Sequence, residues 1–468
     1  MRRWLSYYHP KLPIFLAYML QQVEYNPRKF FKWASKAPDL TKVMHRQKLV
    51  WTLKAYILVI IIYFLFCFYL FLGVVYLLLS PLTGLFALFI TPFMVVLLTY
   101  MIVLTGWLYY EEPRRNRLIK QASKKFKNHP GIKIAIEGSY GKTSMKELLA
   151  TVLGEAKSVA ATPGNKNVPV SHAAWVKKLS GKEDILLIEY GEGAPGDIAK
   201  LAKLSQPDYA IITGLAPNHL DEYKNLDAVA ADLLSIKEYV KPSNVFVNDS
   251  SFTGHDLSGL SAFSANEVLS WKIKSVKVGY EGTSFEMHKK QKTIEVSSGL
   301  IGRHQVAPLA LAAALAYELG LKITDIEAGL AKTTPFEHRM QPRQQGGAWI
   351  IDDTYNGSLE GIKAGLDLLS ELPAKRKIYI TPGLVDQGEE TERVHLEIGK
   401  KISQVKPDKL VLMQNSVTQF IVKGLEEGGY RGDLQIEVDP LEFYTNLEHM
   451  VAAGDLVVMQ NDWTDNYS

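Results

Sequence analysis

Cysteine is almost absent from this chain of 468 residues. The single cysteine, Cys67, can form neither a disulfide framework nor a cysteine-based metal site. The beginning of the sequence also lacks the short apolar core and small-residue cleavage site of a signal peptide. We therefore expect a chain that works in the cytosol and that keeps any membrane segment it carries.

Charge is missing from one long stretch of the chain. Residues 55–110 contain no Asp, Glu, Lys or Arg, and two apolar runs, 55–79 and 82–109, lie on either side of Ser80-Pro81. A membrane-spanning helix needs about 20 consecutive apolar residues. Residues 55–110 are therefore predicted to form a two-helix transmembrane hairpin, with a buried hairpin in a soluble core as the alternative.

Basic residues flank this apolar stretch on both sides. Residues 1–54 carry a net charge of +9 and residues 111–128 a net charge of +5, whereas residues 129–468 carry −10. The positive-inside rule then predicts a multi-pass protein of the cytoplasmic membrane, with residues 129–468 on the cytoplasmic side and the 80–84 turn outside. The acidic character of residues 129–468 argues against nucleic acid as a partner.

The two basic segments differ in composition. Residues 1–54 mix aromatic and basic side chains, which is typical of helices at a membrane surface but also of an ordinary amphipathic packing helix. Residues 111–128 are predicted to be a basic linker.

A glycine-rich loop follows the linker. Residues 132–136 are predicted to form a buried strand, residues 137–144 read E-G-S-Y-G-K-T-S, and a helical run begins at Met145. Such a loop wraps phosphate with backbone N–H groups at a helix start, while its lysine adds charge and its threonine can bind Mg²⁺. The pattern predicts an ATP site, with a purely structural turn as the alternative. The predicted nucleotide-binding residues here are Gly138, Ser139, Gly141, Lys142, Thr143 and Ser144.

Several further motifs follow in a fixed order. They are T-P-G-N-K-N-V-P at 162–169, E-Y-G-E-G-A-P-G-D-I at 189–198, T-G-L-A-P-N-H-L at 213–220, G-R-H-Q-V at 302–306 and D-D-T-Y-N at 352–356. Together with the phosphate loop, this series resembles the Mur ligases, and most closely the branch that adds D-Ala-D-Ala to the muramoyl tripeptide. The resemblance covers roughly residues 129–460.

The resemblance implies a reaction. Mur ligases transfer the γ-phosphoryl group of ATP to a carboxylate, and an amine then attacks the acyl phosphate. Charge on the transferring group has to be neutralised by cations. By resemblance, Lys142, Glu189, His219 and Lys237 would be the catalytic residues, and Thr143, Glu189, His219 and a carbamylated Lys237 would hold Mg²⁺.

For the rest of the chain the resemblance implies an α/β fold in two parts. Residues 129–335 would be a central parallel-sheet domain with the phosphate loop, and residues 336–468 a smaller C-terminal α/β domain that closes on the nucleotide. In that second domain Arg339 would bind the phosphates, Asp352 the ribose, and Asn356 would lie near the domain junction.

Some positions depart from the family pattern. The family's N-terminal UDP-sugar-binding domain has no counterpart, because the membrane hairpin and its flanks take its place. Gln305 and Pro308 replace asparagines of the family, and residues 460–467 replace its K-G-S-R segment. A lipid-linked substrate would explain the membrane anchor.

We therefore expect a membrane-anchored, ATP-dependent carboxylate–amine ligase that acts on a peptide-bearing cell-wall or other envelope precursor. Two alternatives stay open. One is a polyglutamate-type polymer synthase, and the other is a non-catalytic nucleotide-binding module of an envelope complex. Within the leading hypothesis Glu189 is expected to matter most for activity, and Glu192, on the loop that follows, much less.

Overall fold

The computed structural model describes residues 6–36, 49–164, 166–217, 222–355, 357–384, 387–439, 443, 447 and 450–461. The chain divides into two compact units, Met1–Leu118 and Ile119–Ser468. Each unit is described by itself.

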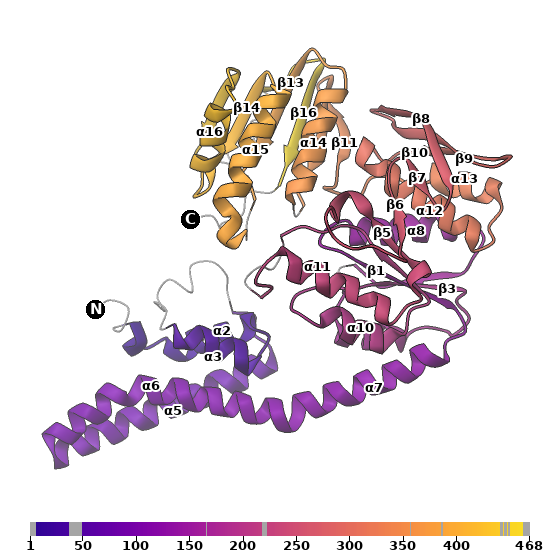
Figure 1. Cartoon of the computed structure of the whole chain (residues 1–468). Coiled ribbons are helices and arrows are strands. Elements are labelled where there is room, and N and C mark those ends of the chain that lie inside the picture. The colour runs from indigo at the N-terminus through magenta and orange to yellow at the C-terminus, as the bar shows by residue number, and fades with distance from the viewer. Residues whose placement is uncertain are drawn as a thin grey trace. The chain divides into compact units, whose positions relative to one another are not determined.

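The first unit contains the predicted pair of long apolar helices, α5 (Leu53–Leu79) and α6 (Pro81–Gly106) (Figure 1). Thr52 caps α5 by accepting the Ala55 N–H at 3.2 Å, and Pro81 begins α6 at the first helical position, where its missing N–H costs nothing. A five-residue π-helical segment, η2 (Trp107–Glu111), and helix α7 (Glu112–Asn128) continue from α6.

Glycines allow α5 and α6 to approach closely near the turn. A Cβ atom on Gly84 would lie 2.2 Å from the backbone of Leu77, and one on Gly73 would lie 2.5 Å from the Leu88 side chain. The two helices therefore pack backbone to backbone in this region, as small residues permit.

Short helices before the hairpin pack against it. The elements η1 (Ser6–Tyr8), α2 (Leu12–Gln22) and α3 (Pro27–Ser35) share one apolar cluster with residues of α5 and α6. The Tyr8 hydroxyl donates to the Phe89 carbonyl of α6 at 2.7 Å. The segment is thus a packing element, while the basic side chains of α3 stay exposed.

The second unit begins with a ten-stranded sheet in the order β10-β9-β8-β7-β6-β5-β4-β1-β3-β2. The six strands from β6 to β2 are parallel, as predicted, and β7 to β10 extend the sheet in antiparallel fashion, which the sequence motifs did not indicate. The strands are β1 (Ile132–Glu137), β2 (Val159–Ala161), β3 (Ile185–Glu189), β4 (Tyr209–Ile212), β5 (Val245–Asn248), β6 (Ser261–Phe263), β7 (Glu267–Val268), β8 (Trp271–Gly279), β9 (Gly282–Lys289) and β10 (Lys292–Ser298).

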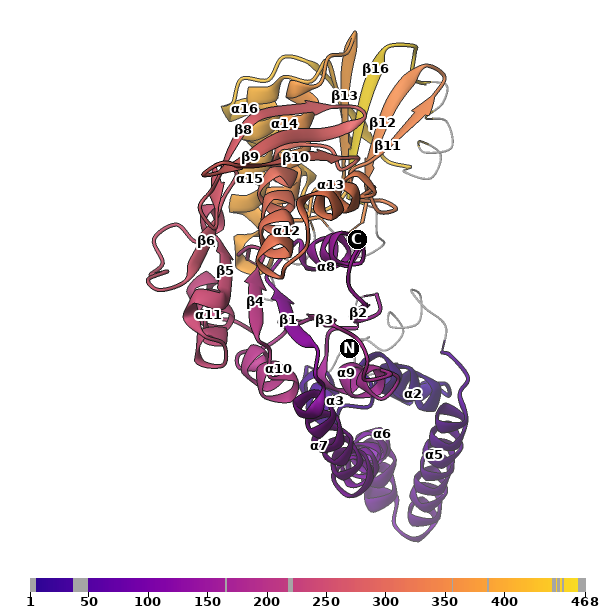
Figure 2. The same ribbon diagram turned by 90° about the vertical axis from the view of Figure 1, so that its right-hand side faces the viewer.

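Helices cover both faces of the parallel part of this sheet. Figures 1 and 2 show α8 and α12 on one face and α10 and α11 on the other. The main core of this domain lies between the sheet and α8 and α12. The helices are α8 (Lys142–Leu153), α9 (Pro169–Val176), α10 (Asp197–Ser205), α11 (Leu226–Leu234), α12 (Val306–Glu318) and α13 (Ile323–Ala331), with short 3₁₀ helices at η3 (Ser235–Glu238), η4 (Pro242–Asn244), η5 (Asp249–Ser251) and η6 (Arg303–Gln305).

A second sheet of six strands follows, in the order β11-β12-β16-β13-β14-β15. All neighbours are parallel except β11 and β12. Its strands are β11 (Gln341–Gln345), β12 (Ala348–Asp353), β13 (Arg376–Thr381), β14 (Lys409–Met413), β15 (Asp433–Glu437) and β16 (Asp455–Gln460), and its helices include α14 (Leu359–Glu371), α15 (Thr391–Val405) and α16 (Thr418–Glu427).

The topology decides where a ligand can bind. In open parallel α/β sheets, ligands bind at the carboxyl ends of the strands. The phosphate loop follows β1, Glu189 ends β3, and Thr213 follows β4, so these residues meet at one edge of the first sheet.

Candidate active site

The glycine-rich loop joins β1 to α8, as the sequence predicted, and α8 begins at Lys142. Gly138 has φ of +133°, and a Cβ atom there would lie 2.4 Å from the Thr213 hydroxyl oxygen and 2.9 Å from the Gly214 nitrogen. Position 138 therefore requires glycine. Thr213 fixes the loop because its hydroxyl contacts the carbonyl oxygens of Glu137, at 3.0 Å, and Tyr140. The free N–H groups at the start of α8 provide an anion site.

Thr143 and Glu189 lie together beside this loop. The Thr143 hydroxyl is 3.1 and 3.2 Å from the two carboxylate oxygens of Glu189. Glu189 is held from behind, because its N–H donates to the Thr162 hydroxyl at 3.0 Å and its carbonyl lies 2.9 Å from Nε2 of His172. Burial lowers the pKa of His172 to about 4, so this imidazole is neutral at physiological pH.

Lys146 is a residue of this site that the sequence analysis did not name. Its ammonium donates to Glu189 Oε2 at 3.0 Å and to the Gly164 carbonyl at 2.6 Å, and both charged side chains are almost fully buried. The only sequence signal was its place one helical turn after Lys142. A buried ion pair of this kind fixes the position of the carboxylate.

The donor set suits Mg²⁺. Carboxylate and hydroxyl oxygens are hard ligands, and Glu189 and Thr143 present both types side by side. In the described part of the chain, at this site or elsewhere, no three His, Cys, Asp or Glu side chains come together as a metal site. His219 lies outside the described residues. Lys237 is exposed on η3 and is not among the residues that line the cavity that contains the loop.

Lys142 points to a second carboxylate. Its ammonium lies 2.9 and 3.1 Å from the carboxylate oxygens of Glu192 and also donates to the Gly138 carbonyl. Glu192 lies on the loop after β3 but is only 6% exposed. Glu137, at the end of β1, is fully buried nearby, and burial raises its pKa well above the ordinary value.

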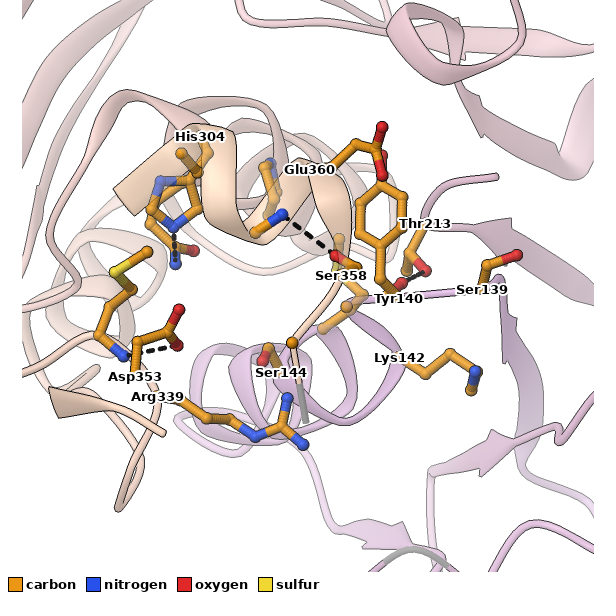
Figure 3. Close-up of a pocket in the computed structure, with 18 of the residues that line it drawn as sticks. Ser139, Tyr140, Lys142, Ser144, Thr213, His304, Arg339, Asp353, Ser358 and Glu360 are labelled. Atoms are coloured by element: carbon orange, nitrogen blue, oxygen red, sulfur yellow. Dashed lines mark hydrogen bonds between the residues drawn. The ribbon is translucent and has the colours of Figure 1, made fainter. Parts of the chain in front are cut away.

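Residues of the C-terminal domain face the phosphate loop across one cavity of about 1740 Å³. Figure 3 shows Tyr140, Lys142 and Ser144 from the loop region, with Arg339 and Asp353 from the C-terminal domain. Ser139, Gly141 and Thr143 also line this cavity, as do Gln305 and Pro308. The Arg339 guanidinium lies over the Tyr355 ring, 4.6 Å from its centroid.

The two neighbouring aspartates of the D-D-T-Y-N motif have different surroundings. Asp352, the predicted ribose ligand, does not line the cavity; it pairs with His338 at 2.9 Å and accepts from the Thr354 hydroxyl at 2.7 Å. Asp353 does line the cavity, and its carboxylate accepts the Met340 N–H at 3.2 Å and the Gln460 amide at 2.7 Å. Alternation along β12 places consecutive side chains on opposite faces, which explains the difference. Asn356 lies outside the described residues.

Fold and site together define a nucleotide-binding α/β protein whose phosphate loop faces a second α/β domain. Two family models match the chain, the Mur ligase middle domain over residues 136–316 and the Mur ligase glutamate ligase domain over residues 338–460. The chain belongs to the Mur ligase family.

Individual relatives agree with this assignment. The UDP-N-acetylmuramoyl-tripeptide--D-alanyl-D-alanine ligase of Escherichia coli K12 is 27% identical over 291 residues, which cover 60% of this chain and 64% of the relative. The MurF ligase of Thermotoga maritima, solved in complex with ADP, shares the fold with a TM-score of 0.63 at 24% identity, covering 74% of this chain and 80% of its own. MurF from Acinetobacter baumannii gives a TM-score of 0.66 at 21% identity, covering 74% and 77%. The first curated relatives are matched over 58–64% of their own length.

Proposed function

We propose that this chain is an ATP-dependent, ADP-forming ligase that joins a carboxylate to an amine through an acyl phosphate. The observation that carries the proposal is the group of Lys142, Thr143 and Glu189 at the carboxyl edge of the first sheet, facing Arg339 and Asp353 across one cavity. We assign residues 129–335 and 336–468 to the two domains of the ligase. The names of the curated relatives suggest a muramoyl peptide and D-alanyl-D-alanine as substrates.

In this proposal each residue has a separate task. The N–H groups at the start of α8 hold the phosphates, and Lys142 moves from Glu192 to neutralise charge on the transferring phosphoryl group. Arg339 adds a second positive charge from the opposite wall of the cavity. Glu189 and Thr143 would hold Mg²⁺, which supplies further charge neutralisation when bound. Closure of the two domains would exclude water from the acyl phosphate.

We further propose that α5 and α6 anchor the enzyme in the cytoplasmic membrane, with both ends of the hairpin and residues 129–468 in the cytoplasm. Both helices are long and apolar enough to cross a membrane, and only 28% of the most apolar window of each is buried. A helix from a soluble core would be mostly buried. Large exposed side chains such as Phe64, Phe71, Leu82 and Phe86 support lipid contact. A lipid-linked peptide precursor would suit an enzyme at this position.

One assay tests the ligase proposal directly. The full chain in detergent is given Mg²⁺-ATP, D-alanyl-D-alanine and either a UDP-linked or a lipid-linked muramoyl tripeptide, and ADP release and the mass of the peptide are measured. We expect ADP release that depends on both substrates and a mass increase equal to D-alanyl-D-alanine minus water. Repeated addition of glutamate in a parallel reaction supplied with glutamate would favour the polymer synthase, and ATP binding without turnover would favour the nucleotide-binding module.

A further inference from the structure

A buried carboxylate beside the phosphate loop already holds an ammonium group. The Lys142 ammonium contacts both oxygens of Glu192, at 2.9 and 3.1 Å, and the Gly138 carbonyl. We call the Glu192 carboxylate and the Gly138 carbonyl oxygen the Glu192 site. Its three oxygen atoms match the three donors of an R–NH₃⁺ group.

A second carboxyl group lies close to this site without a partner. Glu137 is fully buried, and neither of its side-chain oxygens has a hydrogen-bond partner. Glu192 and Asp232 act on Glu137 as neighbouring negative charges, and Lys142 acts on it as a positive one. Unpartnered buried carboxyl oxygens are costly, so this group favours a hydrogen-bond donor next to it.

The proposed function removes the present cation. When ATP binds, Lys142 has to reach the phosphates, and Glu192 then loses its partner. Within the described residues Lys142 is the one cation recorded in an ion pair with Glu192. A carboxylate with 3% of its side chain exposed cannot remain uncompensated without a large cost.

Asp232 is acidic and therefore cannot take the place of the Lys142 ammonium beside Glu192. It does not complete a metal site either. Its two oxygens already accept the Gly196 N–H and the Tyr223 hydroxyl, both at 2.7 Å. Among the described residues, no third His, Cys, Asp or Glu side chain joins Glu192 and Glu137 to form a metal site. An ammonium group needs only the contacts that Lys142 now makes.

We propose that, once ATP has drawn Lys142 away, the Glu192 site binds the ammonium group of the acceptor amine. This inference rests on the proposed ligase function and makes Glu192 a residue that contacts the second substrate. Nucleotide binding would then open the amine site, because Lys142 occupies it beforehand.

Glu192→Gln tests this inference. With D-alanyl-D-alanine as the probe, we expect the KM for the amine to rise about tenfold or more, since a hydrogen bond to a charged group is worth about 1.5–3 kcal/mol. Formation of the acyl phosphate should persist. It is measured without the amine by trapping with hydroxylamine, which is largely uncharged at mildly alkaline pH and does not need the Glu192 site. Glu371→Gln is the matched control, because Glu371 also lines the cavity and pairs with a cation, Arg303 at 2.8 Å.

Three outcomes would overturn the inference. The amine KM could stay unchanged while hydroxamate formation falls, which would mean that Glu192 acts only on Lys142. Excess Mg²⁺ could restore the variant, which would make Glu192 a metal ligand. The control could also lose amine affinity equally. If the wild-type chain forms no hydroxamate with any muramoyl peptide, the ligase proposal fails by itself. The Glu192 site is then tested by calorimetric binding of D-alanyl-D-alanine to the chain loaded with a non-hydrolysable ATP analogue. Glu192→Gln should weaken the binding that the wild type shows by about tenfold or more, and equal binding by the two chains would overturn the inference.

Discussion

Lys142 lies at the start of α8, and 15% of its side chain is exposed. It contributes charge to the loop but little apolar packing. Lys142→Ala should therefore lower ATP turnover about a hundredfold or more, comparable to the loss of one preorganised electrostatic contact, while the fold persists. ADP release and circular dichroism check the two parts of this expectation. Lys178→Ala, at an exposed lysine on the same domain, is the control. Near-normal ADP production by Lys142→Ala would refute the role of the loop.

Glu189 has a structural and a chemical role that can be separated. Glu189→Gln removes the buried partner of the Lys146 ammonium and leaves it only the more exposed Glu147, at 3.5 Å, and breaking a buried pair costs about 3–5 kcal/mol. We expect lost activity with partial recovery at high Mg²⁺, together with a lower melting temperature. In the double variant Lys146→Met/Glu189→Gln the melting temperature should recover and the activity should not. Recovery of both would assign Glu189 a purely structural role.

Glu137 should make stability depend on pH. Burial raises its pKa in the folded chain well above the value of about 4.5 expected when unfolded, so the folded state holds the proton more tightly. This contribution to the free energy of unfolding is complete below about pH 4.5 and is lost as pH rises through the folded pKa. Denaturant unfolding of the wild type from mildly acidic to neutral pH should show this loss, and Glu137→Gln should have a flatter profile. Parallel profiles would contradict the expectation.

For individual residues, the sequence predicted the phosphate loop but not the side chains that contact it. Local spacing was enough to place Lys142 and Thr143, because strand, glycines and helix start lie within a few residues of each other. The contacts of Lys142 with Glu192 and of Lys146 with Glu189 depend on the neighbouring β1 and β3, which only the folded sheet specifies. The motif also suggested that Glu192 is less important than Glu189, and its burial and ion pair change that expectation.

Among the elements, the α5–α6 hairpin offers a direct comparison between two glycines. A Cβ atom on Gly84 would overlap the Leu77 backbone, whereas a Cβ atom on Gly106 would have no atom within 4 Å. Gly84→Leu should therefore separate the helices near the turn and lower the melting temperature in detergent, and Gly106→Leu should not. Disulfide crosslinking between α5 and α6 near the turn would report the separation. Equal effects of the two substitutions would contradict the close packing.

Elements with a clear local pattern were predictable, and those that depend on distant pairing were not. Strand β1 is a short apolar run between two glycines, and it lies where the sequence predicted it. The antiparallel strands β7 to β10 each contain charged residues, and no motif indicated that they would extend the sheet. The packing of α2 against α5 likewise depends on contacts between separate parts of the chain.

For the whole molecule, the membrane proposal predicts the sides of three positions. In a Cys67→Ser background, cysteines at 35 and 178 should react with a membrane-impermeant maleimide only after permeabilisation of the inner membrane, and a cysteine at 83 should react from outside. The reason is that Lys and Arg flank both ends of the uncharged hairpin. Labelling of 35 and 178 from opposite faces would exclude the hairpin topology.

The strand order of the second sheet has a consequence for the synthesis of the protein. β16 comes after all other strands of that sheet in the chain, yet it lies between β12 and β13. While the ribosome is still translating, the first sheet can already be complete, but β12 and β13 have open edges that nothing in the nascent chain can fill until residues 455–460 emerge. The second domain therefore cannot complete its sheet before residues 455–460 have emerged, and until then the exposed edges of β12 and β13 are open to chaperones and proteases.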